Sequence, residues 1–150
     1  MTQTILVILA IAAGMSISIQ ASINAMMGQL AHNTFLSLTI AFTISALFSA
    51  LALWGFSERT SITFFSLPWY FWLVAAIFTC FGVGTMYFLI PKLGVGQVMA
   101  YALAGQLIGA MIINHFGFLG NTAIALNSYR LIGACFLIAG VFLINMGARQ

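Results

Sequence analysis

Polar or small residues recur at every fourth position in the first apolar stretch, at Ser16, Gln20, Asn24 and Gly28. On a helix this spacing places them on one narrow stripe. The surrounding run is uncharged and exceeds the roughly 20 residues that cross a bilayer core of about 30 Å. Because an unpaired amide costs roughly 2 to 7 kcal/mol in hydrocarbon, Gln20 and Asn24 must face other helices or a water-filled cavity. The pattern predicts a membrane helix with one polar face.

Four further apolar stretches follow the first. Polar residues 32–33 separate the first stretch from the second, and polar residues 57–66 separate the second from the third. Pro68 suits the first turn of the third helix. We expect Pro91 and Gly94 to end the third helix, because proline disfavours helical geometry in the residue before it and glycine permits a turn. The predicted fold is a single all-α domain of five transmembrane helices, which cover about residues 4–30, 35–56, 67–90, 94–116 and 124–147. The last helix starts near Ala123 or near Tyr129, and ends near Ile144 or Gly147.

Composition agrees with an integral membrane protein. The chain is 63% hydrophobic and 3% charged, whereas a soluble domain has about 25% charged residues. The net charge of +3 comes from scattered Lys and Arg residues that form no patch, so nucleic acid is not an expected partner. Cys80 and Cys135 lie in apolar runs without metal-ligand spacing, and we expect no metal, disulfide or cofactor.

The chain has few side chains that could act as a general acid or base, because it contains one acidic residue and two histidines. We therefore expect a transporter rather than an enzyme. The best candidates for substrate contact are the amides Gln20, Asn24 and Gln106, which both donate and accept hydrogen bonds. The alternative is that these amides only join helices. Weaker candidates, for which packing is the alternative role, are Ser16, Trp72, Tyr87 and Tyr101.

His115 is the candidate proton carrier, because histidine titrates near neutral pH; the alternative is an ordinary interfacial histidine. No predicted span contains a carboxylate. We therefore expect a neutral, zwitterionic or weakly anionic substrate, or uncoupled transport, while a cation held by aromatic faces and amides remains open.

Glycine spacing indicates where helices pack. Gly105 and Gly109 form a GxxxG pattern, and Gly133, Gly140 and Gly147 recur every seven residues. Such faces let two helix backbones approach closely. The alternative is that glycine is simply common in membrane helices.

The balance of Lys and Arg bears on orientation. Five spans place Arg59 and Arg130 on one side of the membrane, and Lys92 and Arg149 on the other. Orientation normally follows a cation excess on the cytoplasmic side, so a tie predicts insertion both ways, or a partner that decides. Two opposed copies of an odd-numbered bundle would form a ten-helix inverted repeat, an architecture suited to alternating access. The alternative is that four charges are too few to decide orientation.

Short motifs are spread over the chain: Gln20–Gly28 (QASINAMMG), Pro91–Gly94 (PKLG), Ala104–Gln106 (AGQ), His115–Gly120 (HFGFLG), Arg130–Ala134 (RLIGA) and Ala139–Val141 (AGV). In combination they resemble the YdcZ-like, five-helix branch of the drug/metabolite transporter superfamily. The resemblance implies a half-size transporter whose full-length relatives have ten helices in two inverted halves. Relatives carry an aspartate where this chain has Asn114, so any role of that carboxylate in coupling is absent here.

The sequence thus predicts a multi-pass inner membrane transporter of small organic molecules, acting in the lipid bilayer as an antiparallel homodimer. Two alternatives remain open. One is a scaffold or assembly protein that does not transport, and the other is one half of a heterodimeric transporter.

Overall fold

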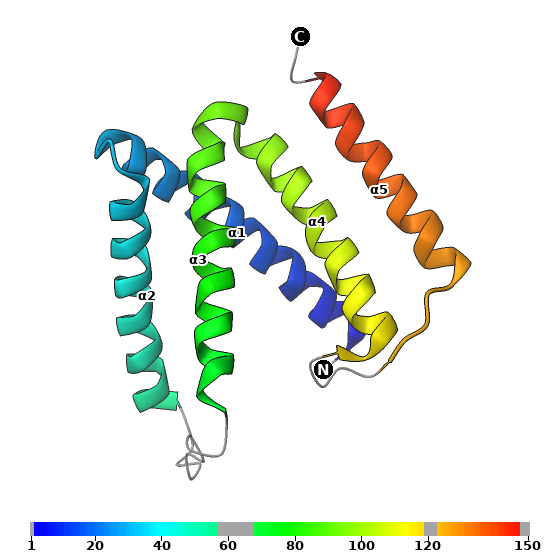
Figure 1. Cartoon of the computed structure of the whole chain (residues 1–150), viewed down its shortest axis with the longest axis horizontal. Helices are drawn as coiled ribbons and strands as arrows, with labels where there is room; N and C mark the ends of the chain where they lie inside the picture. The colour runs from blue at the N-terminus through cyan, green and yellow to red at the C-terminus, as the bar shows by residue number, and fades with distance from the viewer. Residues whose placement is uncertain (1, 57–67, 119–122, 148–150) are drawn as a thin grey trace. The chain divides into compact units, whose positions relative to one another are not determined.

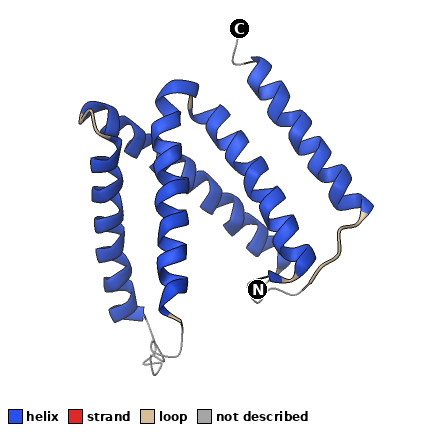
Figure 2. Ribbon diagram, in the orientation of Figure 1, coloured by secondary structure: helices blue, strands red, loops and turns tan. Residues whose placement is uncertain are grey.

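Five α-helices make up the secondary structure of the part of the chain described by the computed structural model, residues 2–56, 68–118 and 123–147 (Figures 1 and 2). Each is long and apolar enough to cross a membrane. The prediction of an all-helical protein with five potential spans is confirmed. The helices are α1 (Gln3–Leu30), α2 (Thr34–Phe56), α3 (Trp69–Leu93), α4 (Val95–Phe116) and α5 (Ser128–Gly147).

The helices fall into two compact units, Met1–Lys92 and Leu93–Gln150. The first unit contains α1, α2 and nearly all of α3, and the second contains α4 and α5. The single five-helix domain stays a prediction. The predicted loop at residues 57–66, the predicted start of the third span at residue 67, the turn at 119–122 and Arg149 lie outside the described residues.

A tight turn joins α1 to α2 in the first unit. The backbone N–H of His32 donates to Gln29 O, and that of Asn33 donates to Gly28 O, at 3.0 and 2.9 Å. With His32 at a φ of +50°, these bonds form the Schellman arrangement that ends many helices. Asn33 Oδ1 then accepts a bond from the N–H of Leu36 and caps α2. The turn folds α2 back against α1.

Small residues allow this close packing. Ala21, Ala25 and Gly28 are the buried residues of α1. A Cβ atom at Gly28 would lie 3.4 Å from Thr34 Cα, which is already van der Waals contact, so atoms beyond a Cβ would press against α2. On α3, a Cβ atom at Gly84 would lie 3.2 Å from the Leu38 side chain of α2. The first unit is therefore held at points where a side chain is missing or short.

The end of α3 differs from the prediction. The helix passes through Pro91 and ends at Leu93, three residues beyond the expected Ile90. Proline lacks an N–H and so removes a single backbone bond here, which the last turn of a helix tolerates because few bonds follow it. Gly94 makes the break instead, since its φ of +84° lies outside the helical region.

The start of α5 agrees with the later of the two predicted starts. The helix begins at Ser128, next to Tyr129, rather than near Ala123. Asn127 Oδ1 accepts a bond from the N–H of Arg130 at 2.9 Å, so Asn127 caps the helix. Residues 123–127 are not helical, and the N–H of Ile124 donates to Asn114 O at the end of α4. The capping bond, rather than the onset of apolar residues, sets this boundary.

Most large apolar side chains point outward; Phe35, Trp54 and Phe136, for example, are at least 74% exposed. A soluble protein rarely exposes so much contiguous apolar surface. Lipid, or other helices within lipid, is the environment that suits such helices.

We predict that Gly28→Leu lowers the free energy of unfolding by about 1 to 3 kcal/mol, because the added side chain would overpack the contact with α2. Thermal unfolding of the detergent-solubilised protein measures the effect. Gly14→Leu is the matched control, since a Cβ atom at Gly14 meets no other atom within 4 Å. An equal loss in both variants would contradict the packing role of Gly28.

Candidate functional site

Asn24 lies at the centre of a group of polar side chains from all three helices of the first unit. Its Nδ2 donates to the hydroxyl oxygen of Tyr87 on α3 at 3.0 Å, and to Gln20 Oε1 on α1 at 3.4 Å. On α2, Ser37 Oγ donates to the backbone oxygen of Asn24 at 2.6 Å. We call Gln20, Asn24, Ser37 and Tyr87 the polar cluster.

The cluster lies within the apolar part of the helices. Asn24 and Tyr87 are each nearly two turns before the end of their helix, which is about 9 Å along the axis. Tyr87 is 1% exposed and Ser37 is 5% exposed, whereas Asn24 is half-buried and Gln20 is exposed. The cluster therefore runs from a buried end at Tyr87 to an open end at Gln20.

Unused hydrogen-bonding capacity remains in the cluster. Tyr87 uses its hydroxyl oxygen as an acceptor for Asn24, which leaves the hydroxyl hydrogen as a donor. Gln20 uses its carbonyl oxygen, which leaves two amide hydrogens. These groups suit a ligand that offers hydrogen-bond acceptors.

Ser16 belongs to the same stripe but points its hydroxyl into its own helix. Ser16 Oγ donates to Ala12 O at 3.0 Å, a bond within α1 that serine commonly makes in membrane helices. Trp72 lies on α3 about four turns before Tyr87, or roughly 22 Å along the axis. The structure thus brings together Gln20, Asn24 and Tyr87, and leaves Ser16 and Trp72 apart from them.

The second unit contains the other predicted residues. Gln106 and Tyr101 are exposed on α4. A Cβ atom at any of the five predicted packing glycines would meet no other atom within 4 Å; they are Gly105, Gly109, Gly133, Gly140 and Gly147. These glycines do not form the contact between α4 and α5, so their role in helix packing stays a prediction.

His115 takes part in local structure. Its Nδ1 accepts a bond from the backbone N–H of Leu126 at 3.4 Å, and its ring meets the edge of Phe116 at 4.9 Å between centroids. His115 therefore helps hold residues 123–127 against the end of α4. A role in proton transfer stays a prediction.

Two polar contacts were not anticipated from the sequence. One is the bond from Ser37 Oγ to the backbone oxygen of Asn24. The only sequence signal for it is that Ser37 follows Asn33 by four residues, which is a helical spacing. The other is between Gln97 Nε2 on α4 and Asn145 Oδ1 on α5, at 2.9 Å. Gln97 and Asn145 are each a single polar residue within a short apolar run, and in a membrane helix such a residue indicates a polar partner.

Residues 2–56, 68–118 and 123–147 contain no candidate metal site, because no three His, Cys, Asp or Glu side chains lie close enough there to hold an ion. The polar cluster is therefore the candidate site, and its chemistry is hydrogen bonding.

A double-mutant cycle with Asn24→Ala and Tyr87→Phe tests the central bond. We expect a coupling energy of about 0.6 kcal/mol, and at most about 1.7 kcal/mol, as for other hydrogen bonds between membrane helices. Unfolding in detergent measures it. Tyr70→Phe, on the same helix, should show no coupling with Asn24→Ala. Equal coupling for both tyrosines would argue against the bond.

Comparison with known proteins agrees with this arrangement. The family model described as "putative inner membrane exporter, YdcZ" matches residues 5–143, nearly the whole chain. Neither the curated proteins nor the solved structures give a significant match. The match confirms the resemblance noted in the sequence. Together with five helices able to span a membrane, it shows that this chain is a multi-pass inner membrane protein that belongs to the YdcZ exporter family.

Proposed function

We propose that the protein exports small organic molecules across the inner membrane by alternating access, as an antiparallel homodimer. The observation that carries the proposal is the polar cluster, an intramembrane hydrogen-bonded group with an open end, in a chain of an exporter family. Polar side chains at such a depth commonly mark substrate pathways.

Gln20 is the most exposed residue of the polar cluster. Its side chain lies on the open side of α1, and Asn24 holds its oxygen. An amide facing hydrocarbon would lose several kcal/mol. A water-filled path beside Gln20, or a second copy of the chain that covers it, would remove this cost. A transporter whose pathway lies between two subunits provides both.

The antiparallel arrangement is supported by the charge tie and the odd number of helices. With equal numbers of Lys and Arg residues on the two sides, neither orientation is favoured. Two opposed copies then form an inverted repeat around a shared pathway. The open faces at Gly105 and Gly109 are surfaces on which helix backbones of another copy can pack closely.

The expected substrate carries no strong positive charge. No carboxylate lies in any of the five helices, so a scheme in which a cation and a proton compete for one buried acid has no acid to use. The amide and hydroxyl groups of the polar cluster suit a neutral, zwitterionic or weakly anionic molecule.

Removal of the exposed amide tests the site. A thermal-shift screen of metabolites and drugs first identifies a ligand that stabilises the protein, and its flux is then measured in vesicles. Gln20→Leu and Asn24→Leu should lower the flux about tenfold or more, because a ligand loses a buried hydrogen bond, while membrane insertion is retained. Ser16→Ala, which removes a bond within α1 only, is the control. Wild-type flux in both Leu variants would overturn the site, and absence of any solute flux would favour the scaffold.

Two charge variants test the antiparallel dimer. Lys92→Gln with Arg149→Gln keeps cations on one side, and Arg59→Gln with Arg130→Gln keeps them on the other, so each variant should insert in one orientation. Each alone should be inactive, and co-expression should restore flux. Full activity of either variant alone, with its termini on one face of the membrane, would contradict the arrangement. A wild-type chain that needs a similar second chain for flux would favour the heterodimer.

A further inference from the structure

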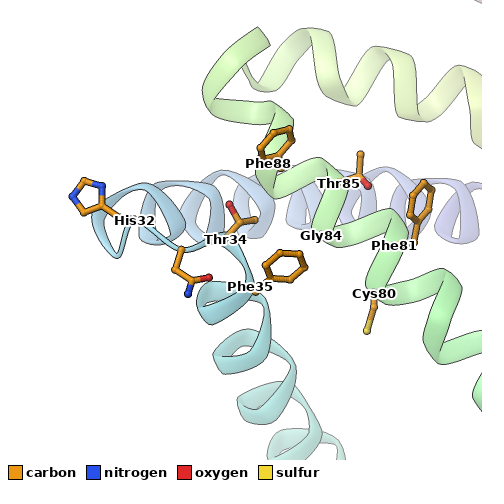
Figure 3. Close-up of a pocket in the computed structure, with 9 residues that line it drawn as sticks. His32, Thr34, Phe35, Cys80, Phe81, Gly84, Thr85 and Phe88 are labelled. Carbon is orange, nitrogen blue, oxygen red and sulfur yellow. The ribbon is translucent and has the colours of Figure 1, made fainter.

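The first unit contains a pocket whose lining includes none of the polar-cluster residues. Its volume is about 490 Å³, within the range of about 300 to 1,000 Å³ that is typical of small-molecule sites. The turn after α1, the start of α2 and one face of α3 line it (Figure 3). The lining residues are His32, Asn33, Thr34, Phe35, Cys80, Phe81, Gly84, Thr85 and Phe88.

The pocket leads from the membrane surface toward the middle of the bilayer. Its residues on α3 extend from Cys80 to Phe88, about 12 Å along the helix. Phe88 is near the end of α3, and Cys80 is near its middle. His32 and Asn33 form the surface end, because they belong to the turn between α1 and α2. A solute of extended shape fits such a space.

Aromatic rings dominate the apolar lining. Phe35 comes from α2, and Phe81 and Phe88 come from α3. Figure 3 shows the Phe35 ring in the space between the two helices. Aromatic pairs in edge-to-face or offset geometry gain free energy beyond the burial of area. An aromatic guest therefore suits this lining better than a saturated one.

The surface end of the pocket has a positive charge beside it. Lys92 Nζ lies 3.5 Å from the centroid of the Phe88 ring. None of the nine lining residues is acidic. The local charge therefore favours an anion and disfavours a cation.

We propose that this pocket binds aromatic carboxylates, with the ring system among Phe35, Phe81 and Phe88 and the carboxylate beside the Lys92 ammonium. The hydroxyls of Thr34 and Thr85, which also line the pocket, are available to the carboxylate or to ring substituents. The inference rests on the proposed function, because it names the class of molecule that the exporter would bind at one face of the membrane.

Cys80 provides a reporter inside the pocket. It is an exposed free thiol, and Cys135 is the other free cysteine. In a Cys135→Ser protein in phosphatidylcholine vesicles, we measure the alkylation rate of Cys80 by N-ethylmaleimide. Biphenyl-4-carboxylate should slow alkylation, and biphenyl-4-methanol should need about a fivefold higher concentration for the same effect, since it lacks the attraction to Lys92. Biphenyl-4-methylamine, as the cation, should protect least. Equal protection by all three, or by none, would overturn the proposal.

Variants separate the charge from the rings. Lys92→Gln should abolish the difference between the carboxylate and the alcohol. Phe81→Ala should weaken protection by both, whereas Phe78→Ala, an equally exposed phenylalanine of α3 that does not line the pocket, should not. An unchanged carboxylate preference in Lys92→Gln, or equal effects of the two Phe variants, would overturn the proposal. Full protection of Cys80 by phosphatidylglycerol alone would overturn it in favour of a lipid site.

Binding and transport are measured separately. Protection of Cys80 without flux of biphenyl-4-carboxylate would support the pocket and count against the proposed transport function. Flux without protection would support transport and overturn the pocket as the binding site.

Discussion

A polar side chain in hydrocarbon needs a polar partner, and this requirement organises the first unit. Asn24 meets it through Tyr87 and Gln20, and Ser37 meets it through the backbone oxygen of Asn24. Because the partners lie on three helices, the same bonds that satisfy the polar groups fix which faces of α1, α2 and α3 meet. Structure and candidate chemistry thus depend on one set of contacts.

These hydrogen bonds also need short distances between helices. Lipid provides no hydrophobic force that drives apolar helices together, so van der Waals contacts between small residues have to hold the helices close. Ala21, Ala25 and Gly28 supply that packing on α1, and Gly84 supplies it between α3 and Leu38. The neighbouring pocket follows from the same arrangement, because Gly84 is among the residues that line it.

Several features of the candidate site were accessible from the sequence. The four-residue spacing of Gln20 and Asn24 indicated one polar face, and the cost of an unpaired amide indicated that this face meets other helices or water. The sequence favours Tyr87 only weakly, because a tyrosine in an apolar run also serves in packing. It gives little signal for Ser37, because a small hydroxyl residue in a membrane helix usually bonds to its own backbone, as Ser16 does.

The sequence alone determined the all-helical class, the five potential membrane helices and the family, since hydrophobic length, charge depletion and local motifs are properties of the chain itself. Only the tertiary structure decided that Asn24 pairs with Tyr87, that α3 continues through Pro91, that Asn127 starts α5 and that a phenylalanine-lined pocket lies beside Lys92. Contacts between residues far apart in the chain depend on how helices approach one another, and helix ends depend on a few capping bonds. Hydrophobicity, which varies smoothly along the chain, specifies neither.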